Sequence, residues 1–254
     1  MKNFRKQTRP KKSQLVFGWN SVIKALSDGV SLDKIYIDTT ANNQFAATVR
    51  KQAAEIGVPI NYVPKAKLDG YNIEGHEGII ALKSKVKYYN LQDVISNVVE
   101  SGEAPLFLIL DGITDIRNIG GIARTAWCCG VHAIIIPEKG VGALNEDAIL
   151  TSAGALELIT VCRVNSIMKA IDDLHLNGFQ VLATEMKAAK TLNSCDFTIP
   201  TAIVMGSEEK GIYPAVAKIC DANIAIPMKN DFESLNVSVA TGMILYEAMT
   251  QRLK

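Results

Sequence analysis

Three short segments in the second half of the sequence place polar side chains beside glycine or proline, as binding and catalytic loops do. Asn118 and Arg124 stand six residues apart in "DGITDIRNIGGIARTA", and Glu208 and Glu209 are adjacent in "GSEEKGIYP". The third segment, "DFESLNVSVATG" (residues 231–242), has Glu233, Ser234, Asn236 and Ser238 just before an apolar helical pattern. Amides, hydroxyls, carboxylates and guanidinium groups hydrogen-bond ligands and position protons. The three segments together predict a binding or catalytic site.

Each segment also has a purely structural interpretation. Asn118 could cap a helix and leave Arg124 in solvent, and "GSEEKG" could be a surface turn. The Ser and Asn residues of the third segment could start the following helix, but one cap needs only one such residue. The excess of polar residues therefore favours a functional loop.

The elements that must position these loops are short apolar runs alternating with helical patterns. Continuous runs of this kind are typical of strands buried on both faces of a parallel sheet, and the βαβα order predicts an open α/β sheet. The three polar segments follow such runs, where open α/β sheets hold their ligands. The runs are "LFLIL", "HAIIIP", "LELITVCRV", "FQVLATEM", "TAIVMGSE" and "ANIAIPM".

A smaller α/β unit precedes this series. Residues 15–88 show helical patterns in "GWNSVIKALSDG" and "NQFAATVRKQAAEIG" and strand patterns in "LDKIYID", "VPINYVP" and "GIIALKSKV". Residues 89–105 are expected to form a helical linker before the second domain, residues 106–254. Residues 1–14 hold six Lys and Arg and no acid, which suits either a solvated, flexible end or an arm that contacts RNA.

Composition excludes several classes of protein. The net charge of +1 excludes binding to nucleic acid by bulk charge, so any such site must be local. No apolar run reaches 18 residues, which argues against a membrane span. The five cysteines lack CxxC spacing and the three histidines are scattered. This favours a reduced cytoplasmic protein with neither a metal cluster nor a Ser/His/Asp triad.

Three longer motifs resemble the SpoU (TrmH-like) RNA ribose 2′-O-methyltransferases. They are "NIGGIARTAWCCGVHAIIIP", "IVMGSEEKGI" and "IAIPMKNDFESLNVSVATGMILYEA", in the family's order within residues 106–254. "VFGWNSVIKAL" and "GHEGIIALKSKV" resemble the start and end of the family's small substrate-binding domain, which is L30e-like, that is, a ribosomal-protein-like α/β fold. Within this family, the sequence most resembles the branch that methylates a guanosine ribose of 23S ribosomal RNA. It departs from that branch at Asn20, which stands where a His is often found.

The resemblance implies a C-terminal α/β trefoil-knot (SPOUT) methyltransferase domain. It implies S-adenosyl-L-methionine as cofactor, no metal, and RNA as partner: 23S rRNA or a ribosome-assembly precursor. It also implies a homodimer and a cytoplasmic location.

The resemblance also implies site residues. The expected catalytic residues are Asn118, Arg124, Glu208, Asn236 and Ser234. Of the two adjacent acids, Glu208 is preferred to Glu209. The expected cofactor-binding group is Met205, Gly206, Ile226, Pro227, Met228 and Leu235. Ser238 is left to start the last helix, and Glu233 has no assigned role.

Other functions stay open from the sequence. Within the family, the substrate could be a tRNA ribose. A non-catalytic RNA-binding protein with a degenerate knot is a second alternative, which the intact set Asn118, Arg124, Glu208 and Asn236 disfavours. A nucleotide-binding α/β oxidoreductase is a third, which the glycine spacing of "NIGGIA" disfavours because a dinucleotide fingerprint needs GxGxxG.

Overall fold

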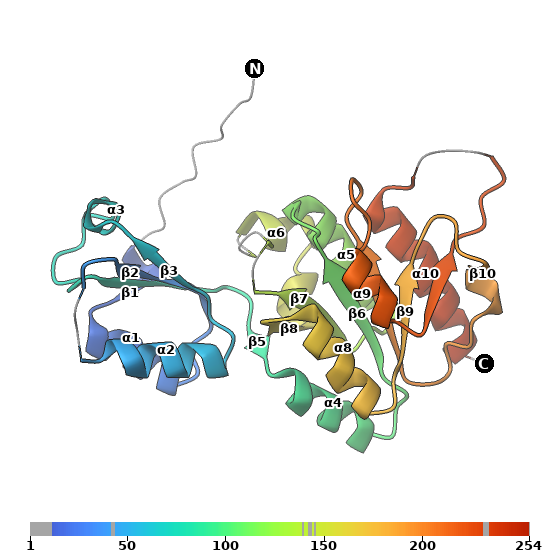
Figure 1. Ribbon diagram of the computed structural model, residues 1–254, viewed down its shortest axis with the longest axis horizontal. Helices are drawn as coiled ribbons and strands as arrows, with labels where there is room; N and C mark the ends of the chain where they lie inside the picture. The colour runs from blue at the N-terminus through green and yellow to red at the C-terminus, as the bar shows by residue number, and fades with distance from the viewer. Residues whose placement is uncertain are drawn as a thin grey trace. The chain divides into compact units, whose positions relative to one another are not determined.

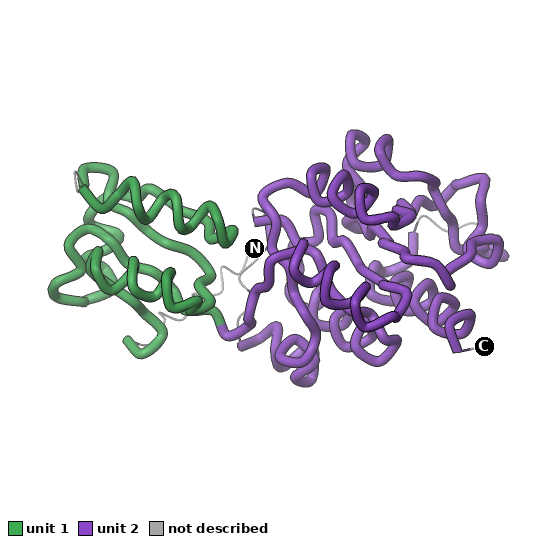
Figure 2. Tube along the Cα trace, turned by 90° about the horizontal axis from the view of Figure 1, so that it is seen from below, with its two compact units in different colours: residues 1–84 green, residues 85–254 purple. Residues whose placement is uncertain are grey.

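The computed structural model describes residues 12–41, 44–138, 140–141, 144, 146–230 and 234–253. The chain forms two compact units, residues 1–84 and residues 85–254 (Figure 2). Most of the basic tail (residues 1–11) and Glu233 lie outside the described residues.

Unit 1 is a four-stranded sheet in the order β1-β4-β2-β3, in which only β2 and β3 pair in parallel. One face of the sheet packs against α1 and α2, whose buried side chains include Trp19, Val22 and Val49. The opposite face packs in part against Leu68 of α3. The elements are β1 (Leu15–Phe17), α1 (Trp19–Ser27), β2 (Leu32–Asp38), α2 (Ala46–Glu55), β3 (Ile60–Val63), α3 (Lys65–Asp69) and β4 (Ile79–Lys83).

Unit 2 contains an eight-stranded sheet in the order β10-β12-β9-β11-β6-β7-β8-β5 (Figure 1). Every pairing in it is parallel, which confirms the predicted open parallel sheet. The strands are β5 (Tyr88–Tyr89), β6 (Leu106–Asp111), β7 (Ala133–Pro137), β8 (Thr160–Val164), β9 (Gln180–Thr184), β10 (Lys190–Thr191), β11 (Thr201–Gly206) and β12 (Ala222–Ala225).

Helices cover both faces of this sheet, because alternate strand residues point to opposite sides. Leu108 of β6 packs into one apolar cluster with α5 (Ile116–Cys128), α6 (Glu146–Thr151), α7 (Ala155–Leu158) and α10 (Val237–Arg252). Its neighbours Phe107 and Ile109 pack into the other with α4 (Leu91–Glu100), α8 (Ile167–Leu176) and α9 (Pro214–Ile219). Unit 2 is therefore a three-layer α/β/α structure.

Two segments differ from the sequence-based expectation. The stretch 89–105 belongs to unit 2 rather than to a linker, because Leu91, Val94 and Ile95 of α4 are buried against the sheet. The apolar run "LELITVCRV" splits between α7 and β8: Leu156 is buried but Leu158 is 61% exposed, and the strand begins only at Thr160. The pattern of a short apolar run does not show where a helix ends and the next strand begins.

The connections between strands bring distant parts of the chain together. β11 lies between β9 and β6, both of which precede it in the chain, and pairs with each of them. After β11 the chain forms β12 on the far side of β9 and then returns to α10, which packs against α5. The loops after β6, after β11 and before α10 therefore meet at the carboxyl edge of the sheet.

The end of α10 is tied to two earlier segments by Arg252. Its guanidinium donates hydrogen bonds to the carbonyl oxygens of Ala104, Pro105 (3.1 Å) and Ile199 (3.0 Å). Burial lowers the pKa of Arg252, while Asp196 opposes the shift. Arg252 thus links the closing helix to the residues just before β6 and β11.

We expect Arg252→Ala to lower the free energy of unfolding by about 2–4 kcal/mol, because it removes three charge-assisted hydrogen bonds, although the carbonyl oxygens of Pro105 and Ile199 still accept from Thr201. Chemical denaturation monitored by circular dichroism measures this. Arg117→Ala, at an exposed arginine of α5, is the control and should change stability by less than about 0.5 kcal/mol. Equal effects of the two substitutions would contradict this role for Arg252.

No helix among the described residues is long and apolar enough to cross a membrane. All five cysteines are free thiols; Cys162 and Cys195 are buried, whereas Cys128 is exposed.

Candidate active site

The loop that follows β11 is a tight turn built on glycine. Ser207 and Gly211 exchange two backbone hydrogen bonds of 3.1 and 2.8 Å. A Cβ atom on Gly206 would lie 2.2 Å from the carbonyl carbon of Gly211, so only glycine fits there. The turn holds Glu208 beside the end of β11.

Asp111, the last residue of β6, anchors the other end of the same loop. Its carboxylate accepts a hydrogen bond of 2.8 Å from the backbone N–H of Tyr213. Burial raises the pKa of Asp111, and the hydrogen bond from Tyr213 opposes that shift. The loop from Ser207 to Tyr213 is therefore fixed at both ends.

The first turn of α5 is fixed by Asp115, whose side chain caps the helix by accepting from the N–H of Arg117 at 2.9 Å. The Arg117 guanidinium also pairs with Asp115 at 2.8 Å and lowers the pKa of that carboxyl. This cap leaves the side chain of Asn118 available for contacts outside the helix.

Asn118, Glu208 and Asn236 form one hydrogen-bonded cluster. Glu208 Oε1 accepts from Asn118 Nδ2 at 3.1 Å, from Asn236 Nδ2 and from the backbone N–H of Val237 at 3.3 Å. Asn236 Nδ2 also donates to Asn118 Oδ1 at 3.1 Å. Three segments that are far apart in the sequence thus meet at a single carboxylate.

Asn236 also starts α10, which corrects the assignment of that role to Ser238. Its side-chain oxygen accepts from the backbone N–H groups of Ser238 (3.0 Å) and Val239 (3.4 Å), and the helix begins at Val237. Capping uses the Oδ1 atom and leaves the Nδ2 group for the cluster. One residue therefore serves both the helix start and the cluster.

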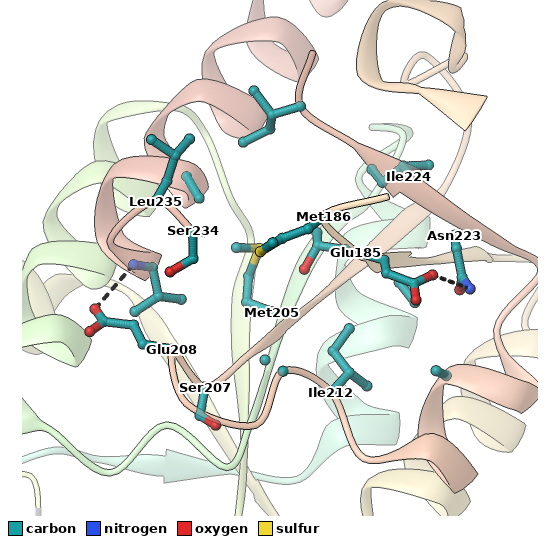
Figure 3. A pocket seen from close by; sticks show the side chains of 18 of the residues that line it. Glu185, Met186, Met205, Ser207, Glu208, Ile212, Asn223, Ile224, Ser234 and Leu235 are labelled. Carbon is teal, nitrogen blue, oxygen red and sulfur yellow. Dashed lines mark hydrogen bonds between the residues drawn. The ribbon is translucent and has the colours of Figure 1, made fainter. Parts of the chain in front are cut away.

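A cavity of about 550 Å³ opens beside the cluster, at the carboxyl ends of β9, β11 and β12 (Figure 3). Its walls are largely apolar, with Glu208 and Ser234 on one side in Figure 3 and Glu185 and Asn223 on the other. The size and the combination of apolar and polar side chains are typical of a small-molecule site. The location is the one expected for ligands of an open α/β sheet.

The sequence matches two family models. Residues 105–246 match the SpoU rRNA Methylase family, and residues 15–89 match a domain described as RNA 2′-O ribose methyltransferase substrate binding. The YacO protein of Bacillus subtilis, described as a TrmH family tRNA/rRNA methyltransferase, is 35% identical over 237 residues, which cover 93% of this chain and 95% of YacO. The chain belongs to the SpoU methylase family.

Solved structures of SpoU methyltransferases have the same fold. AviRb from Streptomyces viridochromogenes, solved in complex with AdoMet, superposes with a TM-score of 0.60 at 22% identity, over 94% of this chain and 90% of AviRb. The A. aeolicus TrmH/SpoU tRNA modifying enzyme superposes with a TM-score of 0.54 at 30% identity, over 64% and 84% of the two chains. The fold class expected from the sequence, a trefoil-knot methyltransferase domain with a substrate-binding domain before it, is confirmed.

The structure brings most of the predicted site residues of this SpoU methylase together. Ser234 and Glu208 line the cavity, as do five of the expected cofactor-binding residues: Met205, Gly206, Ile226, Met228 and Leu235. Pro227 is exposed and does not line it. Arg124 is exposed on α5, and six residues turn it about 120° around the helix axis from Asn118.

Several residues that line the cavity were not predicted from the sequence. Glu185, Met186 and Asn223 line the cavity but fall outside the three polar segments. Glu185 is near the end of the predicted run "FQVLATEM" and directly follows β9, so the rule that ligands bind beyond the carboxyl ends of strands points to its position but does not separate it from an ordinary surface carboxylate. Among the described residues, no group of three or more His, Cys, Asp or Glu side chains is placed to hold a metal ion.

We expect Asn236→Ala to lower the methylation rate at least 100-fold, because it removes a donor to Glu208 and the cap of α10. The lost cap should also cost about 1 kcal/mol of stability. Asn236→Asp is the matched variant: aspartate caps a helix equally well but cannot donate to Glu208 and repels its carboxylate, so the cap should be kept and activity lost. Single-turnover methylation assays and thermal unfolding measure the two effects. Retained activity in both variants would remove Asn236 from the site.

Proposed function

We propose that this protein transfers a methyl group from S-adenosyl-L-methionine to a ribose 2′-hydroxyl of RNA. The observation that carries the proposal is the convergence of Asn118, Glu208 and Asn236 beside the apolar cavity. Membership of the SpoU methylase family supplies the reaction class.

The residues present fit the cofactor. Met205, Ile226 and Leu235 offer apolar surface to an adenine ring, and the ends of β11 and β12 offer backbone groups to its edge. When bound, S-adenosylmethionine supplies an electrophilic methyl group, so the protein has chiefly to align the two reactants. We assign Met205, Gly206, Ile226, Met228 and Leu235 to cofactor binding on this basis. Pro227 does not line the cavity, and its assignment rests only on its place between Ile226 and Met228.

The cluster and Arg124 have different roles in this proposal. Glu208 draws Asn118 and Asn236 together and so fixes the edge of the cavity where the RNA must enter. Ser234 lines the cavity at the same edge and contributes a hydroxyl. The Arg124 guanidinium gives up a proton too reluctantly to act as the base. It binds the RNA phosphate next to the reacting ribose and orients the hydroxyl.

We assign RNA recognition to the substrate-binding domain, residues 15–88, and the most specific form of the proposal is a guanosine ribose of 23S rRNA. The match of residues 15–89 to a substrate-binding domain of RNA ribose methyltransferases supports the first part, and the resemblance of the sequence motifs supports the second. A tRNA ribose is the second candidate, favoured by the likeness to the A. aeolicus tRNA modifying enzyme. Both candidates keep the same reaction.

The substrate is tested by mapping 2′-O-methyl groups in total RNA from cells with and without the gene. Loss of one guanosine mark in 23S rRNA supports the proposal. Loss of a tRNA mark instead would assign the enzyme to tRNA, and an unchanged map would contradict both candidates.

We also propose that the protein acts as a homodimer. Val239, Met243 and Tyr246 form an exposed stripe on α10 and are 50%, 47% and 64% exposed. Apolar residues at such spacing on one helix face favour burial against another surface. Sedimentation at micromolar concentration should give the mass of two chains, and Tyr246→Glu should shift it towards one. A monomeric wild-type protein would contradict the proposal.

A further inference from the structure

Glu185 and Asn223 form a polar pair in the wall of the cavity away from the catalytic cluster. Glu185 follows β9, Asn223 belongs to β12, and the Asn223 amide donates to Glu185 Oε2 at 2.8 Å. The backbone N–H of Glu185 donates to the carbonyl oxygen of Ile224 at 2.9 Å. Figure 3 shows the pair across the cavity from Glu208 and Ser234, with Met186 and Met205 between them.

The pair is built to present an acceptor to a ligand. The amide of Asn223 holds one carboxylate oxygen, and among the described residues no other side chain hydrogen-bonds Glu185. A carboxylate has two oxygens and about four acceptor positions, so most of its capacity remains for donors inside the cavity. The ligand group must therefore carry hydrogen-bond donors.

The neighbours of the pair indicate which donors these are. Asn223 and Ile224 lead directly into Ile226, which we assign to the adenine wall. The ribose is bonded to adenine, so an acceptor next to the adenine wall lies within reach of the ribose 2′- and 3′-hydroxyls. An acidic side chain beyond the end of a parallel strand accepts from ribose hydroxyls in other open α/β sheets.

We propose that Glu185, held in place by Asn223, accepts hydrogen bonds from the ribose diol of the nucleoside cofactor. The inference rests on the proposed function, because it assumes that the cavity holds S-adenosylmethionine. It makes Glu185 a determinant of cofactor recognition rather than of the methyl transfer step.

Calorimetric titration of the full-length protein tests the inference with S-adenosylhomocysteine, with 5′-methylthioadenosine and with the 2′-deoxy and 3′-deoxy analogues of the latter. 5′-Methylthioadenosine keeps the ribose but lacks the amino-acid tail. We expect Glu185→Ala to weaken both S-adenosylhomocysteine and 5′-methylthioadenosine by about 10- to 100-fold, the range for hydrogen bonds to a charged group. Glu185→Gln keeps the side-chain shape, and its affinities for both compounds should lie between those of Glu185→Ala and those of the wild type.

The deoxy analogues make the test specific. In the wild type, removing one ribose hydroxyl from 5′-methylthioadenosine should weaken its affinity about tenfold. In Glu185→Ala the same removal should weaken the affinity less than about twofold, because the carboxylate that accepts from this hydroxyl is already absent. Glu157→Ala is the control: it deletes an exposed carboxylate on α7 that does not line the cavity, and should leave all four affinities within about twofold.

Two results would overturn the inference. One is an equal loss on deoxygenation in the wild type and in Glu185→Ala. The other is a Glu185→Ala variant that weakens S-adenosylhomocysteine but not 5′-methylthioadenosine, because the carboxylate would then face the ammonium group of the tail. A wild-type protein that binds neither compound would instead contradict the proposed function.

Discussion

Arg124→Ala is expected to lower methyl transfer by at least 1,000-fold while leaving the affinity for S-adenosylhomocysteine within about threefold of the wild type. Arg124 is exposed on α5 and does not line the cavity, so its removal leaves the cofactor walls intact. We expect the loss because, in the proposed function, the guanidinium binds a phosphate and aligns the ribose, and alignment contributes many orders of magnitude to such reactions. Single-turnover assays and calorimetry measure the two quantities.

Arg117→Ala is the matched control for this prediction. Arg117 lies on the same helix, is exposed, and has the same charge, but its guanidinium is paired with Asp115. We expect this variant to keep at least a third of the wild-type rate. A comparable loss of rate in both variants would mean that Arg124 acts only through its positive charge. Full activity of Arg124→Ala would mean that Arg124 is not part of the site.

Gly206→Ala should abolish both cofactor binding and catalysis. The added Cβ would meet the backbone of the turn at 2.2 Å from the carbonyl carbon of Gly211 and 2.3 Å from the nitrogen of Ile212. Backbone atoms of a turn that is hydrogen-bonded at Ser207 and anchored through Asp111 have no room to yield. The loop must open, and Glu208 is displaced from its partners.

Gly242→Ala provides the comparison, because the same added atom would lie 3.7 Å from the nearest side chain, that of Thr125. Gly242 lies inside α10, where alanine is favoured over glycine by about 1 kcal/mol. This variant should bind S-adenosylhomocysteine as the wild type does and melt at an equal or higher temperature. If Gly206→Ala binds the cofactor normally, the turn is not the part of the site that we describe.

The sheet was largely predictable from the sequence, whereas its strand order was not. The run 106–110 reads as a strand because every one of its residues is apolar, and all are buried in β6. Nothing in that pattern places β11 between β6 and β9, because strand order depends on long-range contacts and on how the connections cross the sheet. The knotted fold was reached only through the resemblance of the motifs.

The site residues were likewise predictable only in part. The excess of polar residues around Asn236 marked a functional loop, but the cap could not be assigned to Asn236 rather than Ser238 without knowing where the helix starts. Glu185 was missed because one carboxylate after an apolar run is a common surface feature. It becomes informative only once β12 brings Asn223 beside it.

Incubation of the purified protein with S-adenosylmethionine carrying an isotope-labelled methyl group and unmodified ribosomal RNA tests the central claim most directly. The RNA is digested to nucleosides and the label is located by mass spectrometry, with Arg124→Ala as the inactive comparison. We predict that the label appears in 2′-O-methylguanosine with the wild type and is absent with the variant. Label on a nucleobase would contradict the assignment. So would the absence of any transfer, with the cofactor bound, both to ribosomal RNA and to transfer RNA in a parallel incubation.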